Sequence, residues 1–125
     1  MINKATIIGR VGKKDYRTTK AGGNMCLLSV CTDKSMLSDA GERKTLTTWH
    51  NINMYSKLAE AANKFVKVGD MIFIMGEIQN RKVDDEKGSR WLYSITAHEF
   101  KVLASSKTHI EEDEKENIDD DFFNR

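Results

Sequence analysis

Two aromatic residues, Trp49 and Tyr55, have the spacing expected of a surface that binds flat ligands. If the segment that holds them is a strand, its side chains alternate between two faces, and both rings share a face otherwise made of Thr and Asn. Leu46, Ile52 and Met54 lie on the other face, where they can cover a core. Rings exposed on a sheet hold unpaired nucleic-acid bases at about 1–3 kcal/mol per stacked base. The alternative is that a loop or a second subunit covers them, because large aromatics are usually buried.

Charge is divided unevenly along the chain. Lys and Arg number 20 and Asp and Glu 19, but residues 111–125 hold 8 acidic and 2 basic side chains. Residues 1–110 therefore have a net charge of +7 and residues 111–125 a net charge of −6. A basic body attracts a phosphate backbone through counterion release, whereas an acidic end competes for that surface or meets a separate partner. The alternative is a mixed charged surface that serves only solubility.

Length and composition indicate one domain followed by a tail. The 125 residues include no apolar stretch of the roughly 18 residues that span a bilayer, and the first ten lack the apolar core of a signal peptide. We therefore expect a soluble, cytoplasmic protein. Cys26 and Cys31 are five residues apart, so in one strand they lie on opposite faces about 16 Å apart, too far for a disulfide. The histidines make no zinc-binding spacing with them, and we expect no metal or cofactor.

The expected order of elements is three strands, one short helix and two long strands. The predicted strands are 4–11, 24–32, 45–55, 71–83 and 90–103, and the predicted helix runs from an N-cap at Ser56 to a C′ residue at Gly69. The turn at residues 84–89 makes the last two strands a protruding hairpin arm. Five strands with a helix after the third are typical of the OB-fold, a Greek-key barrel that binds oligonucleotides. The pattern therefore predicts an all-β protein of this class.

Short motifs along the chain resemble those of the bacterial and phage single-stranded DNA-binding proteins. They are Asn3-Lys4, Ile7-Ile8-Gly9, Gly12, Gly22-Gly23, Thr48-Trp49-His50-Asn51, Lys57-Leu58-Ala59-Glu60, Gly69-Asp70, Gly76, Arg81-Lys82 and Asp119-Asp120-Asp121-Phe122-Phe123. Their order and spacing make the resemblance specific. It implies an OB-fold domain at residues 1–103 that binds and protects single-stranded DNA without catalysis, during replication, recombination and repair. It also implies a homotetramer, with a dimer as the alternative, located in the bacterial nucleoid or a phage-infected cell.

The resemblance assigns residues to the nucleic-acid-binding surface. Trp49 and Tyr55 match stacking positions of the family, in agreement with the face described above. Met36 and Val83 match two stacking positions that are often Trp in the family, and a Met thioether can still lie against a base. Cationic positions of the family correspond to Arg17, Lys57, Arg81 and Lys82, and Lys4, Lys44 and Arg90 are further candidates. Each cation taken singly could instead be a solvated surface charge.

Two more aromatics, Trp91 and Tyr93, share one face of the last predicted strand. They could add to the stacking surface and compensate for the aliphatic residues. The favoured interpretation is that they pack in the barrel or at a subunit contact.

The tail at residues 104–125 is predicted to be a disordered docking peptide, because it is acidic and poor in apolar residues. Phe122 and Phe123 would enter an apolar pocket of a partner, while Asp119–Asp121 meet its basic rim. By resemblance, the partners are replication, recombination and repair proteins. Asn124 and Arg125 follow the phenylalanines, whereas the family normally ends on the hydrophobic residue. The short linker lacks the usual Gly, Pro and Gln, which favours a phage or plasmid type.

Two other functions fit parts of the sequence. An RNA-binding or translation-type OB module would use the same stacking face, because stacking does not distinguish the sugars. A metal-dependent nuclease would use Asp84, Asp85 and Glu86 as Mg²⁺ ligands. Adjacent carboxylates on a strand end point in divergent directions, so the nuclease is the weaker alternative.

Overall fold

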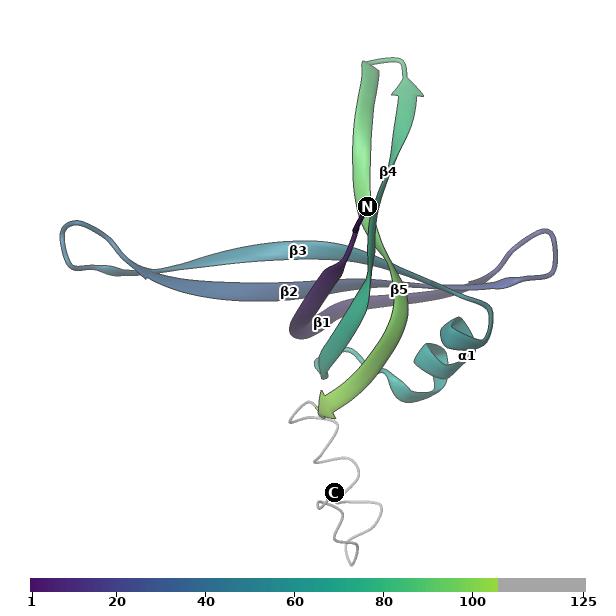
Figure 1. Ribbon diagram of the computed structural model, residues 1–125, viewed down its shortest axis with the longest axis horizontal. Coiled ribbons are helices and arrows are strands. Elements are labelled where there is room, and N and C mark those ends of the chain that lie inside the picture. Colours follow the sequence, from purple (N-terminus) through teal and green to yellow (C-terminus); the bar gives the residue numbers. More distant parts are fainter. Residues whose placement is uncertain (106–125) are drawn as a thin grey trace, which may run out of the picture.

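The chain forms a closed barrel of five strands with one helix, shown in the computed structural model of Figure 1, which describes residues 1–105. The elements are β1 (Ala5–Thr18), β2 (Asn24–Leu37), β3 (Arg43–Tyr55), α1 (Ser56–Phe65), β4 (Met71–Asp85) and β5 (Gly88–Ala104). Around the barrel the strands follow the order β1-β2-β3-β5-β4, and only β3 and β5 pair in parallel. The predicted all-β, OB-type barrel with a helix between the third and fourth strands is confirmed.

Three hairpins project from the barrel in different directions (Figure 1). The β4–β5 arm was expected, but β1 and β2 are longer than the sequence predicted. β1 continues past Gly12 to Thr18, because residues 13–18 pair with residues 24–29 of β2. A bulge between Val11 and Lys13 marks the point where β1 changes its partner from β4 to β2. Two-stranded ribbons expose both faces, so their polar sequences lack the alternation by which strands are predicted.

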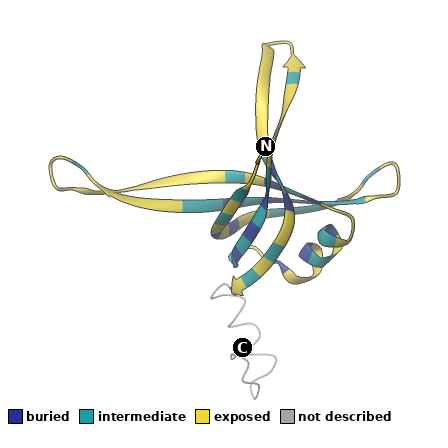
Figure 2. Ribbon diagram, in the orientation of Figure 1, coloured by how far each residue is buried: buried dark blue, intermediate teal, exposed yellow. Residues whose placement is uncertain are grey.

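The core lies inside the barrel and beneath α1, where the ribbon of Figure 2 is coloured as buried. Its buried members are Val11, Cys26, Leu28, Val30, Ile52, Met54, Ala59, Ala62, Val66, Ile72, Ile74, Ile95 and Ala97. Ile52 and Met54 are fully buried, as predicted, but Leu46 is 57% exposed, so its assignment to the core was wrong. At Leu46 the β2–β3 hairpin has left the barrel, and among residues 1–105 no second layer covers that side chain.

The helix differs from its prediction at both ends. Tyr55 occupies the N-cap position without a side-chain hydrogen bond, and Ser56 is the first helical residue, with φ of 58°. The helix ends at Phe65 rather than at Gly69, because Val66 is extended and its side chain is fully buried. Gly69, with φ of 98°, serves instead the turn in which the Asp70 amide donates to the Lys67 carbonyl at 3.0 Å.

A lysine from β1 stabilises the end of the helix. Lys14 Nζ donates hydrogen bonds of 3.0 Å to the carbonyl oxygens of Asn63 and Val66. A cation at this end also interacts favourably with the helix dipole. This contact joins α1 to the part of β1 that lies beyond the predicted strand at residues 4–11.

Cys26 and Cys31 are free thiols, in agreement with their spacing. Burial raises the pKa of the Cys26 thiol above its ordinary value. Within residues 1–105, no helix is both long enough and apolar enough to cross a membrane.

Candidate nucleic-acid interface

A groove of about 580 Å³ lies between the outer face of β1, β2 and β3 and the base of the β4–β5 arm. Four strands supply its principal side chains: Arg17 from β1, Tyr55 from β3, Arg81 from β4 and Tyr93 from β5. Amide side chains lie between these rings and cations. The amides are Asn51, Asn53, Gln79 and Asn80. Rings, guanidinium groups and amides together are suited to bases and phosphates.

Strand register brings the first two of these side chains together. Met25 of β2 pairs with Arg17 of β1 on one side and with Tyr55 of β3 on the other. Cross-strand partners point to the same face of a sheet, so the three side chains form one row across the outer face. The adjoining row contains Asp15, which lies two residues before Arg17.

The guanidinium group of Arg17 is held by Asp15. Its Nε donates to Asp15 Oδ2 at 2.8 Å, and its Nη2 lies 2.6 Å from the same oxygen. This hydrogen bond, together with the negative charge of Asp15, raises the pKa of Arg17 above its ordinary value. The ion pair is exposed, so we expect it to orient Arg17 while leaving the other guanidinium nitrogen available to a ligand.

Trp49 lies on the same face of β3 as Tyr55, as the alternation predicted. Trp49 is 58% exposed and Tyr55 43%. Six residues of strand separate them by about 20 Å, and Asn51 and Asn53 of the groove lie on the same face between them. The Trp49 ring rests on the β1 backbone: a Cβ placed on Gly12 would lie 2.5 Å from indole Cζ3. One side of the ring is therefore supported by protein, and the ring remains open to solvent elsewhere.

Two predicted residues lie on a different surface. Met36 and Lys44 pair with each other in the part of the β2–β3 hairpin that projects beyond the barrel. Lys44 is five residues from Trp49, an odd number, so both side chains lie on the opposite face of the ribbon from Trp49. Met36 is exposed there. The structure thus separates these two residues from the row that contains Arg17 and Tyr55.

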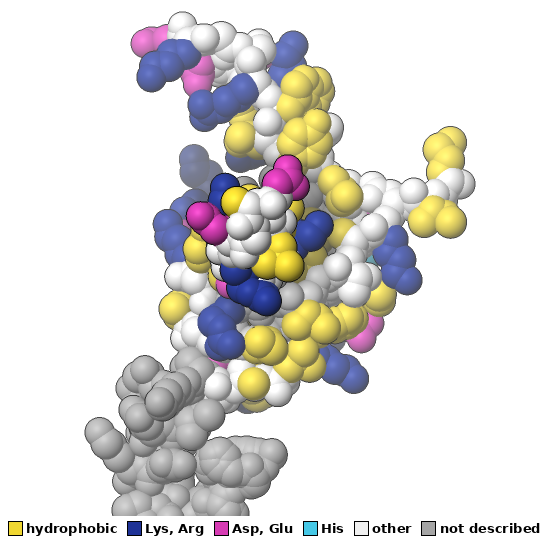
Figure 3. Space-filling model, turned by 90° about the vertical axis from the view of Figure 1, so that its left-hand side faces the viewer, with side chains coloured by type: hydrophobic (Ala, Val, Ile, Leu, Met, Phe, Trp, Pro, Cys, Tyr) yellow, Lys and Arg dark blue, Asp and Glu magenta, His cyan; other side chains and the backbone are white. Residues whose placement is uncertain are grey.

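The remaining predicted cations are not among the residues that line the groove. Lys57 is exposed in the first turn of α1, and Lys4 precedes β1. Lys82 pairs with Trp91 on the arm, and Arg90 lies 3.7 Å from Asp85 in an ion pair. Figure 3 shows Lys and Arg side chains on the β2–β3 hairpin, which points toward the viewer, and on the β4–β5 arm, with hydrophobic side chains exposed among them. Among the ten predicted binding residues, Arg17, Tyr55 and Arg81 line the groove.

Tyr93 is among the groove residues that sequence reasoning did not assign to the binding surface. The favoured interpretation packed Tyr93 and Trp91 in the barrel or at a subunit contact, but they are 61% and 55% exposed and do not pack inside the barrel. Both precede Ile95, where β5 enters the core. Their cross-strand partners, Asn80 and Lys82, are polar, which indicates that this face of the β4–β5 hairpin lies outside the core.

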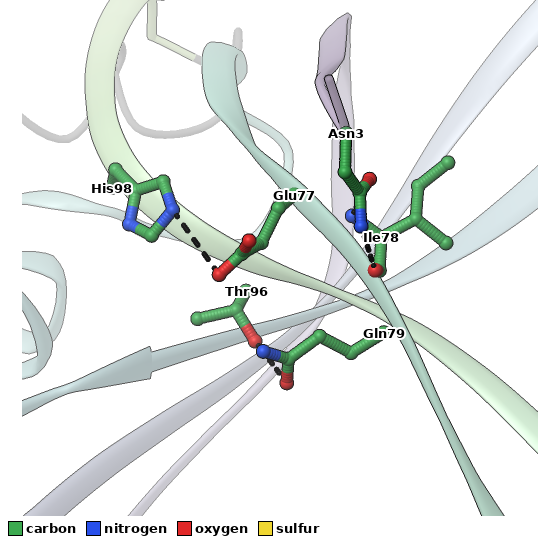
Figure 4. A network of polar contacts seen from close by, with 6 residues as sticks. All are labelled: Asn3, Glu77, Ile78, Gln79, Thr96 and His98. Carbon is green, nitrogen blue, oxygen red and sulfur yellow. Dashed lines mark hydrogen bonds and ion pairs between the residues drawn. The ribbon is translucent and has the colours of Figure 1, made fainter. Parts of the chain in front are cut away.

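Polar contacts fix the base of the arm, where β4 and β5 leave the barrel (Figure 4). The Asn3 side chain donates to the Ile78 carbonyl at 2.8 Å and accepts from the Ile78 amide at 3.0 Å. Beside it, Thr96 Oγ1 donates to Gln79 Oε1 at 2.8 Å, and His98 Nε2 lies 3.6 Å from Glu77 Oε1. These contacts tie the N-terminal segment and both strands together where the arm leaves the barrel, beside the groove that Arg81 and Tyr93 line.

The carboxylates at the tip of the arm do not form a metal site. Asp84 accepts a hydrogen bond from the Ser89 hydroxyl. Asp85 accepts from the Lys87 amide at 2.9 Å and forms the ion pair with Arg90. Within residues 1–105, no group of three or more His, Cys, Asp and Glu side chains could hold a metal ion.

Solved structures of other proteins show the same fold. The chain matches a Plasmodium falciparum single-stranded DNA-binding protein, solved in complex with single-stranded DNA, with a TM-score of 0.73 and 22% identity. That match covers 83% of this chain and 95% of the other. A deletion mutant of the Thermus aquaticus single-stranded DNA-binding protein gives a TM-score of 0.71 at 18% identity, covering 82% of this chain and 50% of that one.

Sequence comparison gives the family. Residues 2–103 match the model of the single-strand binding protein family, and the chain belongs to this family. Single-stranded DNA-binding proteins of Neisseria meningitidis serogroups A and B are both 39% identical to it over 104 residues. These matches cover 82% of this chain, which spans 60% of the length of each relative.

Proposed function

We propose that the chain binds single-stranded DNA with little sequence preference and protects it during replication, recombination and repair. One observation supports this most directly: Trp49 and Tyr55 stand exposed on one sheet face, and Tyr55 shares a groove with Arg17 and Arg81. Bases would stack on the rings while the guanidinium groups neutralise phosphates. Amide side chains between the rings can hydrogen-bond a base without requiring one particular sequence.

Lys4, Lys44, Lys57, Lys82 and Arg90 would act at longer range. They lie around the groove or on the hairpins, where they raise the local positive potential and extend the phosphate contacts. Met36 would contact a base only if the bound DNA passes around the edge of the β2–β3 hairpin to the face opposite Trp49.

The family is one of DNA-binding proteins rather than enzymes. That membership, and the hydrogen bonds and ion pair that engage Asp84 and Asp85, argue against the nuclease alternative. The RNA-binding alternative has no observation of its own in its favour, because the groove side chains do not identify a contact specific to a 2′-hydroxyl.

Assembly and recruitment are further parts of the proposal. We propose a homotetramer, with a dimer as the alternative, since Ile8 is exposed on the outer face of β1 beside its half-buried partner Phe73. The acidic tip at residues 119–123 would recruit replication, recombination and repair proteins. The tip belongs to the tail proposed at residues 104–125, of which Ala104 is the last residue of β5 and residues 106–125 lie outside the described residues. The phage or plasmid origin likewise stays a prediction.

A titration with three oligomers of equal length, dT, rU and a duplex, tests the binding proposal. We expect fluorescence anisotropy to show dT bound well ahead of duplex, with affinity that falls as salt rises. Trp49→Ala should weaken dT binding by about 1–3 kcal/mol, the value of one stacked base. Phe65→Ala is the matched control, because Phe65 is equally exposed at 58% but lies on α1. A preference for rU would favour the RNA alternative, and unchanged affinity in Trp49→Ala would contradict the stacking role.

A further inference from the structure

The β4–β5 arm presents two rings that the assignment by family resemblance leaves out. Trp91 and Tyr93 are 55% and 61% exposed and occupy alternate positions of β5, so they point to the same face of the ribbon. Their Cα atoms are about 7 Å apart. Within the described part of the chain, neither ring takes part in a side-chain hydrogen bond or in a ring contact. A two-stranded ribbon has no layer behind it that would cover them.

The face of the arm that holds Trp91 and Tyr93 is opposite the face of Val83, the position at which the family resemblance places a stacking ring. Val83 pairs with Arg90, and Arg81 pairs with Leu92, so these four side chains share one face of the arm. Trp91 and Tyr93 share the other face with their partners Lys82 and Asn80. The arm therefore has an aliphatic residue at the expected stacking position and two rings on the reverse side, with a cation beside the outer ring.

The two rings are continuous with the groove. Tyr93 and its partner Asn80 line it from this face of the arm, and Arg81 and Leu92 line it from the other face. Trp91 is the next residue outward from Tyr93 on the same face. A strand of nucleic acid that leaves Tyr55 would meet Tyr93 at the mouth of the groove. From there, Trp91 and the Lys82 ammonium offer a second ring and a phosphate contact in the same direction.

We propose that Trp91 and Tyr93 form a second stacking platform, which directs bound single-stranded DNA along the face of the arm opposite Val83. This inference rests on the proposed function and deepens it, since it gives the path of the DNA beyond the groove. A nucleic acid fits this face better than a second copy of the chain does, because the rings alternate with a cation and an amide rather than with apolar residues.

The chain contains two tryptophans, which allows each to be observed separately. In Trp49→Phe the only indole is Trp91, and the ring at position 49 is kept. On titration with dT, we expect Trp91 emission to be quenched with the same midpoint as the anisotropy of labelled dT. The reciprocal variant Trp91→Phe reports Trp49 alone and should also be quenched.

Affinity provides the second measurement. Trp91→Leu and Tyr93→Leu should each weaken dT binding about 5- to 150-fold, the range that corresponds to one stacked base. Phe65→Leu removes a ring of similar exposure on α1 and should bind as the wild type does. Val83→Ala, on the opposite face of the arm, should change the affinity less than twofold.

Three results would overturn the inference. If dT binds Trp49→Phe normally while Trp91 emission stays constant, the DNA takes another path although the proposed function stands. If Trp91 emission changes on dilution of the free protein and not with DNA, a second copy covers the ring. If no variant and no wild-type protein binds dT, the proposed function fails and this inference fails with it.

Discussion

Gly12 should determine how well Trp49 stacks on a base, and Gly12→Ala tests this. The added Cβ would lie 2.5 Å from indole Cζ3 and 2.6 Å from Cη2, whereas carbon atoms in contact are about 3.5–4.0 Å apart. The far end of the ring must therefore move by about 1 Å. It can do so because Trp49 is exposed on its outer side, so we expect the thermal midpoint to change by only a few degrees.

The cost of Gly12→Ala should appear in binding instead. A shift of about 1 Å at the far end of the indole is a rotation well below about 30°. A side chain held about 30° from its rotamer loses about 0.5–1.5 kcal/mol, so we expect the dT dissociation constant to rise by no more than about 13-fold. Anisotropy with labelled dT at fixed salt measures the affinity, and differential scanning calorimetry measures the thermal midpoint. Trp49→Ala should abolish the effect of Gly12→Ala in the double variant, because the ring that the methyl group displaces is then missing.

Gly9→Ala is the matched control on the same strand. There the added Cβ would lie 2.3 Å from the Cys31 carbonyl oxygen, a backbone atom that cannot move without shifting β2. We expect Gly9→Ala to lower the free energy of unfolding by about 1–3 kcal/mol, with unchanged affinity in the folded fraction. The reasoning would be refuted if Gly12→Ala bound dT as tightly as the wild type, or if it lost as much stability as Gly9→Ala.

Three further predictions concern other parts of the molecule. Asn3→Ala removes both hydrogen bonds to Ile78 and should lower the free energy of unfolding by about 1 kcal/mol, measured in urea; an unchanged midpoint would show that water replaces the amide. Cys31 should react with a thiol reagent in the native protein while Cys26 reacts only after unfolding, because Cys26 is fully buried and burial raises its pKa. Equal labelling rates by mass spectrometry would contradict this. Deletion of residues 111–125 removes a net charge of −6 and should leave dT binding unchanged or tighter at fixed salt; weaker binding would mean that the tail does not compete with DNA.

Local patterns were sufficient wherever a strand has one buried and one open face. Ile52 and Met54 face the core, and Trp49 and Tyr55 face outward, as the alternation predicted. The same pattern failed at Leu46, because alternation does not indicate where a strand leaves the barrel. Turn residues gave the order of elements but not their lengths: Gly12 marks a bulge within β1 rather than its end.

The order of the elements, the outward face of β3 and the contrast between a basic body and an acidic end all follow from the amino-acid sequence. These properties depend on neighbouring residues and on simple counts. Only the tertiary structure placed Arg17, Tyr55, Arg81 and Tyr93 in one groove, since they come from four strands. Their meeting depends on strand register and barrel closure, which are set by contacts between residues far apart in the chain. Similarly, only the strand pairing put Met36 on the reverse of the β2–β3 hairpin and left Trp91 uncovered on the arm.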